Sequence, residues 1–172
     1  MVKTFSKHLR HPLWLAAIIL AFWWLFFGYK YQFTYCYGPS MEPSYLHGEW
    51  MVVEPVKERR VERFDVVIVN VEGEALAKRI IGVEGEYVHI QWGKIFIDDK
   101  EFKEPYGNGE VIYWVEDEEV RKKKPKHRWL FFNVDEDIGL VPEGYVFVIG
   151  DNRNISWYGM VKVKEIKSIV VL

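Results

Sequence analysis

The sequence predicts a mainly β protein, in which an N-terminal transmembrane helix is followed by a coiled antiparallel β-barrel or sandwich. Residues 13–27 form an unbroken apolar run without a charged or polar side chain. The rest of the chain carries short runs rich in β-branched and aromatic residues, separated by charged or glycine-containing breaks. We therefore divide the chain into a short N-terminal segment (1–12), a membrane anchor (13–29) and a β-rich domain (30–172).

Composition excludes several classes of protein. The chain has 172 residues, of which 49% are hydrophobic, so it can bury a proper core. Its net charge of −2 argues against general nucleic-acid binding, and no nucleic-acid partner is expected. Cys36 is the single cysteine, which excludes an intrachain disulfide and a cysteine-based zinc site. No metal or organic cofactor is implied.

The apolar run, with Gly28 and Tyr29, is near the lower end of the roughly 17–25 residues that span a bilayer. Lysine and arginine precede it, so the positive-inside rule places the N-terminus in the cytoplasm and the chain after Lys30 outside it. A cleaved signal peptide and a buried core helix stay open as alternatives. Bulky residues follow the run where a signal-peptide cleavage site would need small ones.

The β-rich domain is read from short apolar runs in chain order. Residues 87–98 read as a hairpin that turns near Trp92 and Gly93. Residues 99–127 are charged and irregular and lead into the basic run 121–128; a solvated hairpin loop is favoured there, and contact with anionic lipid or nucleic acid is the alternative. The remaining expected strands are 49–56, 64–71, 75–83, 128–134, 144–150 and 166–172.

The stretch "YCYGPSMEPSY" (35–45) indicates a tight turn that presents a small hydroxyl. Gly38 frees the backbone, Pro39 restricts it, and Pro43 prevents a regular helix or central strand. Ser40 in such a turn is either an exposed nucleophile or an ordinary loop serine.

A serine hydroxyl needs a neighbouring base to become a useful nucleophile. Histidine is the usual base, and His47 and His89 are the candidates in the β-rich domain outside the basic loop. Neither has an evident carboxylate to orient it. Both are read as ordinary surface or strand histidines.

Lys78 is a different kind of candidate. Strand alternation puts Lys78 on one face of its strand and Arg79 on the other, so one of the two charges is expected to be shielded. Shielding lowers the pKa of a lysine, and a neutral amine can serve as a general base, which arginine cannot. A lysine that snorkels at the sheet edge is the alternative.

A third polar cluster, "GDNRNIS" (150–156), follows directly after an apolar strand. Gly150, Asp151 and Asn152 give a turn signal, Asp151 can pair with an arginine, and Ser156 can orient an amine. A simple turn with a solvated aspartate is the alternative.

Taken in order, these stretches resemble the type I signal peptidases, the membrane-bound serine/lysine proteases of family S26. The resemblance rests on "GPSMEPS", "KRIIGVEGE" and "GDNRNIS", and on the hairpin and anchor in their expected places. It covers most of the chain and weakens across 99–140.

The resemblance implies a serine endopeptidase that cleaves signal peptides through an acyl-enzyme. Ser40 would attack from the side opposite to that used by most serine proteases, Lys78 would be the base, and the Ser40 N–H would bind the oxyanion. Ser156 would hydrogen-bond Lys78. Arg79 would pair with Asp151, and Met41 would keep the pair dry.

Two departures from the family pattern stand out. The usual further Asp-Ser-Arg stretch after Ser156 is absent, and some members carry a serine where this chain has Gly38. A pilin-maturing S26 peptidase and a non-catalytic membrane-anchored binding protein are therefore kept as alternatives. Self-cleaving SOS repressors use a similar pair, but no DNA-binding domain is visible.

The resemblance also implies a location and partners. A bacterial plasma membrane is preferred over the mitochondrial inner membrane, whose members share "GPSMEP". The partners expected are preproteins with signal peptides and the lipid bilayer, with the protein-export machinery as a further candidate.

Overall fold

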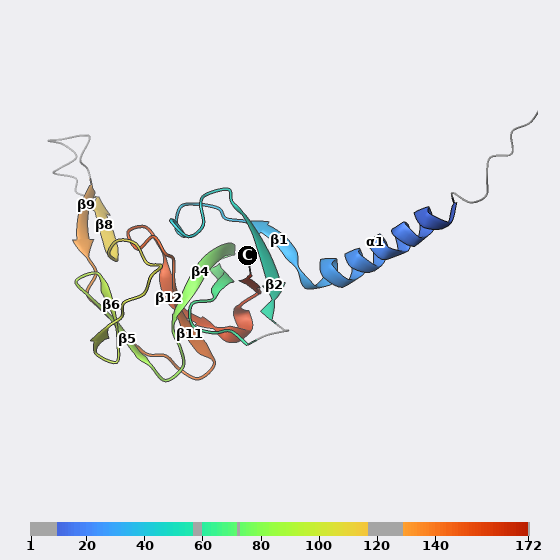
Figure 1. The fold of residues 1–172 in the computed structure, drawn as a ribbon. Helices are drawn as coiled ribbons and strands as arrows, with labels where there is room; N and C mark the ends of the chain where they lie inside the picture. The colour runs from blue at the N-terminus through green and yellow to red at the C-terminus, as the bar shows by residue number, and fades with distance from the viewer. Residues whose placement is uncertain (1–9, 57–59, 72, 117–128, 172) are drawn as a thin grey trace, which may run out of the picture.

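A computed structural model describes residues 10–56, 60–71, 73–116 and 129–171 of the chain. Helix α1 (Arg10–Lys30) extends away from a body built from antiparallel strands (Figure 1). The mainly β, antiparallel fold that the sequence predicts is confirmed. Within the described residues, no helix combines the length and apolarity that a membrane crossing needs.

The larger sheet has seven strands in the order β1-β2-β13-β3-β4-β11-β12, and each neighbouring pair is antiparallel. Strand β13 therefore lies between β2 and β3, far from both in sequence. The strands of this sheet are β1 (Gln32–Tyr35), β2 (Trp50–Pro55), β3 (Val66–Val71), β4 (Glu74–Gly82), β11 (Tyr145–Ile149), β12 (Tyr158–Lys162) and β13 (Ser168–Val170).

A four-stranded sheet in the order β10-β5-β6-β7 and a two-stranded sheet, β8-β9, complete the body. The predicted hairpin is confirmed: β5 and β6 are joined by Trp92 and Gly93, both at positive φ, as a tight two-residue turn requires. The strands are β5 (Tyr87–Gln91), β6 (Lys94–Ile97), β7 (Lys100–Glu101), β8 (Ile112–Glu116), β9 (Trp129–Asn133) and β10 (Glu136–Leu140), and a short 3-10 helix, η3 (Val163–Glu165), precedes β13.

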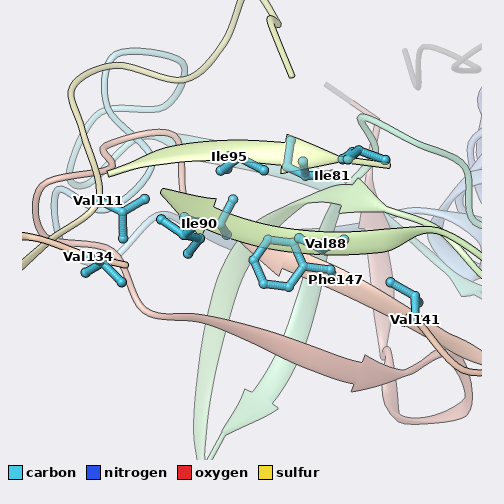
Figure 2. Close-up of a cluster of buried hydrophobic side chains, with 10 residues drawn as sticks. Ile81, Val88, Ile90, Ile95, Val111, Val134, Val141 and Phe147 are labelled. Atoms are coloured by element: carbon cyan, nitrogen blue, oxygen red, sulfur yellow. The ribbon is translucent and has the colours of Figure 1, made fainter. Parts of the chain in front are cut away.

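Two hydrophobic clusters use consecutive residues of β4. Ile81 packs with Val88 and Phe147 between the large and small sheets (Figure 2), while Ile80 packs with Val67 in a second cluster. Consecutive residues of a strand point to opposite faces, so the second half of β4 is buried on both sides. This double burial explains why two large apolar residues, Ile80 and Ile81, follow one another in the strand.

The expected irregular region 99–127 is wrong in part, because β7 and β8 fall within it. The basic run 121–128, for which a solvated loop was favoured, lies outside the described residues. Strands β1, β10 and β12 carry polar or glycine-containing sequences that give no strand signal, whereas β8 is apolar and aromatic but lies within the charged region 99–127.

Candidate active site

Ser40 lies in the loop that joins β1 to β2. The loop is closed at its base, where Cys36 N donates to Glu49 O at 2.8 Å. Gly38 has a φ of +85°, and its N–H donates to His47 Nδ1 at 2.9 Å. The turn that the sequence predicts around Ser40 is therefore held from both sides.

Lys78 reaches Ser40 from strand β4. Its Nζ lies 2.9 Å from Ser40 Oγ and 2.9 Å from the Ala77 carbonyl oxygen. Only 1% of Lys78 is exposed, and β4 lies inside the sheet between β3 and β11. The alternative of a snorkelling lysine at the sheet edge is therefore wrong.

Burial changes the acid–base behaviour of Lys78. Desolvation lowers the pKa of its amine from 10.5 to about 8, against smaller opposing effects of Cys36 and Asp151. A substantial fraction of neutral amine thus exists in mildly alkaline solution. In that form the Ser40 hydroxyl can donate to the Nζ lone pair across the same contact, which is the geometry of a nucleophile beside its base.

Arg79, the next residue on β4, points to the opposite face and forms the expected ion pair with Asp151. Its guanidinium donates to both carboxylate oxygens, at 2.8 and 2.6 Å, and its Nη1 donates to the Phe64 carbonyl at 2.9 Å. Both side chains are buried. Burial of both Lys78 and Arg79 goes beyond the prediction that one of them is shielded.

The last motif is fastened to the nucleophile loop through the backbone of Ser40. Asn152 N donates to Ser40 O at 3.0 Å, and Asn152 Nδ2 donates to Pro39 O at 3.3 Å. Among the described residues the Ser40 N–H donates to no acceptor, although Asn152 holds the carbonyl oxygens of both Pro39 and Ser40. An N–H held in this way is suited to bind a developing oxyanion.

Ser156 is placed differently from the expectation. Its Oγ accepts from Gly150 N at 2.7 Å and donates to Trp157 O at 3.0 Å, whereas Lys78 bonds Ser40 and Ala77. The expectation of a hydrogen bond between Ser156 and Lys78 is therefore wrong. Ser156 Oγ instead stabilises the turn that places Gly150 next to the nucleophile loop.

Met41 is fully buried, as the expectation of a dry site requires. It packs in a third hydrophobic cluster with Cys36, Met51 and Val53. This cluster forms the apolar wall next to the loop that carries Ser40.

The two histidines whose side chains the structure describes, His47 and His89, have partners other than Ser40 and Lys78. His47 accepts from Gly38, and the ring of His89 stacks on Phe96 at 5.0 Å in the small sheet. Among the described residues, no group of three or more histidine, cysteine, aspartate or glutamate side chains is arranged to hold a metal ion.

Several residues of the site had no signal in the sequence. Phe64 supplies a carbonyl to Arg79 from a backbone with φ of +73°, and the Tyr106 ring lies 3.8 Å from the Arg79 guanidinium. Glu104 pairs with Arg153 nearby. These contacts join segments far apart in the chain, so no local spacing announces them.

Comparison with known proteins decides the family. The sequence profile described as "Signal peptidase, peptidase S26" matches residues 9–170. The chain belongs to this signal peptidase family. The family resemblance drawn from the sequence is thereby confirmed, and the pair of Ser40 and Lys78 lies in a serine endopeptidase of family S26.

Signal peptidases of several bacteria are similar over most of the chain. Signal peptidase I of Bacillus caldolyticus is 28% identical over 170 residues, covering 91% of this chain and 85% of the relative. Signal peptidase IB of Staphylococcus aureus is 29% identical, covering 83% and 76%. A crystal structure of signal peptidase I from Enterococcus faecalis is 24% identical, with a TM-score of 0.42, and covers 64% of this chain and 97% of that one.

Proposed function

We propose that this protein cleaves N-terminal signal peptides from exported preproteins, with Ser40 as nucleophile and Lys78 as general base. The observation that carries the proposal is the 2.9 Å contact between Lys78 Nζ and Ser40 Oγ, made by a lysine whose pKa is lowered by burial to about 8. The relatives named above are all called signal peptidases, which disfavours a pilin-maturing peptidase and a non-catalytic binding protein.

Acylation begins when Lys78 Nζ takes the proton of Ser40 as Oγ bonds to the scissile carbonyl carbon. The carbonyl electron pair moves to the oxygen, which the Ser40 N–H stabilises; one such donor is worth about 3–4 kcal/mol of barrier. Collapse of the intermediate breaks the C–N bond. The Lys78 ammonium then protonates the leaving amine.

Deacylation repeats the proton transfers with water. Lys78 takes a proton from water as the water oxygen bonds to the acyl carbon, and the ester C–O bond then breaks. The proton returns to Ser40 Oγ, which restores the resting pair. One lysine thus serves both halves of the reaction.

The surrounding residues position this pair. The ion pair between Arg79 and Asp151 holds β4 against the last motif, and Ser156 holds the Gly150 turn. Gly38 supplies the positive φ of the nucleophile turn, and Met41 excludes water from one side.

We further propose that α1 anchors the chain in the plasma membrane, with residues 1–12 cytoplasmic, residues 13–29 in the bilayer and the domain from residue 30 outside the cytoplasm. Large apolar side chains are exposed around α1, among them Ile18, Leu20 and Leu25. Exposed apolar side chains on all sides of a helix favour a lipid environment.

Aromatic side chains mark the face of the domain next to α1. Phe33, Tyr35 and Trp50 on β1 and β2 are exposed, and Tyr35 meets Trp50 edge to face. Tyrosine and tryptophan favour the interface between lipid and water. This face adjoins the Ser40 loop, so the site would lie close to the membrane surface where preproteins emerge from the export machinery.

Cleavage of a preprotein by purified full-length protein tests the proposed activity. Wild type should release one defined peptide, identified by mass, and Ser40→Ala should release none. Ser44→Ala, a serine in the same loop, is the matched control and should keep activity. Absence of cleavage by the wild type would favour the binding protein, and cleavage of pilin precursors alone would favour the pilin-maturing class.

Fractionation tests the anchor. The full chain should resist alkaline carbonate extraction, and protease added outside spheroplasts should digest the domain from residue 30. Release by carbonate would refute the anchor. Protection of the domain together with accessible residues 1–10 would reverse the orientation.

A further inference from the structure

A second buried ion pair lies behind the pair of Arg79 and Asp151. Arg153 donates to the Glu104 carboxylate, and the two side chains are only 5% and 6% exposed. Arg153 Nη1 also donates to Gly150 O at 2.6 Å. Breaking a buried pair by removing one partner is costly, so this contact fixes where both segments lie.

Glu104 belongs to the segment 102–110, between β7 and β8, which runs beside the last motif. Asn108 N donates to Asp151 O at 2.8 Å, and Arg153 N donates to Asn108 O at 2.9 Å. The Glu104 carboxylate accepts from Gly107 N at 2.8 Å and so closes its own turn. The segment is thus fastened to the residues on both sides of Asn152.

The same segment covers the first ion pair. Tyr106 places its ring 3.8 Å from the Arg79 guanidinium, and the centre of the Phe64 ring lies 5.6 Å from that of Tyr106. Glu104 also accepts from Tyr106 N at 2.8 Å. The segment therefore links Arg153 and Arg79 in one cluster.

We propose that Glu104 and Arg153 are positioning residues for the peptidase reaction: they balance the charge beside Asp151 and thereby control the protonation of Lys78. The inference rests on the proposed function. The cluster holds two carboxylates, Glu104 and Asp151, and two guanidiniums, Arg79 and Arg153. Its net charge is therefore zero, and every single neutral substitution unbalances it.

The charged groups that act on Lys78 include one member of this cluster, Asp151. Asp151 faces Lys78 from the loop after β11 and raises its pKa, and Cys36 of the nucleophile loop acts in the same sense only as the thiolate, which burial disfavours. Arg79 lies on the other face of the same strand, paired with Asp151. Opposite Lys78 on β3 stands Val67, which carries no charge. Asp151 is thus the carboxylate through which the cluster acts on Lys78.

The sign of the effect differs between the two partners. Glu104→Gln removes a negative charge and leaves Arg153 uncompensated, which disfavours the Lys78 ammonium and lowers its pKa. Arg153→Gln leaves Glu104 uncompensated and raises it. The ascending limb of the pH–rate profile is the part where the rate rises as Lys78 loses its proton. We expect this limb to shift to lower pH in the first variant and to higher pH in the second, each by on the order of half a pH unit.

The test is the pH dependence of single-turnover cleavage by the full chain. The double variant Glu104→Gln/Arg153→Gln restores neutrality, so its limb should return to the wild-type position while its rate stays lower. The control is Glu101→Gln in the neighbouring strand, where the partner Lys94 and Glu101 are exposed. Glu101→Gln should move nothing.

A limb that stays fixed in Glu104→Gln, or moves the same way in both single variants, would overturn the proposal. The pKa of Lys78 can also be measured without catalysis, by NMR titration of its ¹³Cε resonance. This resonance is assigned because it is missing from the spectrum of Lys78→Met. Opposite shifts there in an inactive wild type would support the charge coupling and refute the proposed function. If a single variant does not fold, the double variant and Arg153→Lys decide the outcome. Arg153→Lys keeps the charge, so its limb should stay at the wild-type position. A shifted limb in either variant would refute charge balance.

Discussion

Gly150 faces the backbone carbonyl of Ser40 without room for a side chain between them. A Cβ at position 150 would lie 2.3 Å from Ser40 O and 2.2 Å from Ser156 Oγ. The last motif thus contacts the nucleophile loop at its backbone, and the distance between these segments sets where Ser40 lies relative to Lys78.

Gly150→Ala should therefore lower the rate of single-turnover cleavage by about 100-fold, because a misplacement of about 1 Å can cost this much. The added methyl must push Ser40 O away, and backbone cannot yield as a flexible side chain can. Gly28→Ala in α1, where the nearest atom would be 4.0 Å away, is the control and should keep the wild-type rate. An unchanged rate in Gly150→Ala would show that this contact does not position Ser40.

Lys78→Arg should lower turnover by about 1000-fold although the charge is kept, since a guanidinium does not give up its proton. Preprotein cleavage measured under single-turnover conditions checks this. Lys94→Arg, an exposed lysine in the small sheet, is the control. Turnover within tenfold of wild type in Lys78→Arg would mean that another group activates Ser40.

The pH–rate profile of cleavage should have an ascending limb with its midpoint near pH 8. Only the neutral amine of Lys78 accepts a proton, and its pKa is lowered to about 8, so the rate should fall tenfold per pH unit well below that value. Rates of single-turnover cleavage from pH 6 to 10 measure the limb. A limb that follows the ordinary lysine value near 10.5 would show that burial does not tune this residue.

Lys78→Met should stabilise the fold at pH 7. Both states are protonated there, and the ammonium is disfavoured only in the folded state, at a cost of about 3 kcal/mol from a pKa of about 8 against 10.5 unfolded. Two lost hydrogen bonds offset about 1 kcal/mol each, which leaves a gain of about 1 kcal/mol.

Denaturant unfolding against pH measures this effect. Wild-type stability should rise between pH 8 and 10.5, where the unfolded chain binds more protons than the folded one. The advantage of Lys78→Met should shrink over the same interval. An advantage that grows with pH would contradict the assignment.

His47→Ala should change the cleavage rate no more than about fivefold, the worth of the one hydrogen bond from Gly38 N that it removes. His47→Asn keeps an acceptor near the same place and should be closer to wild type. His89→Ala, in the small sheet, should have no effect. Collapse of activity in His47→Ala would make histidine the base.

Much of the β domain could be predicted because its central strands are buried on both faces. β3, β4 and β11 are rich in apolar residues, since most of β3 and β11 and the second half of β4 are buried. Strands β10 and β12 could not, because β10 is largely exposed and β12 contains glycine beside polar residues.

The site divides in the same way. Ser40 and Lys78 could be predicted since a tight turn, and a lysine and an arginine on opposite faces of an apolar strand, are local features of the sequence. The place of Ser156 could not, because its Oγ has two possible partners and the fold decides between them. Glu104 and Tyr106 join the site through tertiary contacts alone, and no pattern around residue 104 records them.

The position of β13 in the large sheet has a consequence for folding during synthesis of the chain. The loop bearing Ser40 leads into β2, and Lys78 is carried by β4, which pairs with β3; only β13 joins β2 to β3. Within the large sheet, the strand after the Ser40 loop and the strand that carries Lys78 are therefore joined only after residue 170 has been synthesised. A nascent chain that ends before β13 carries both residues but lacks the strand that completes the sheet between them, so the order of synthesis delays assembly of the active site until the end of translation.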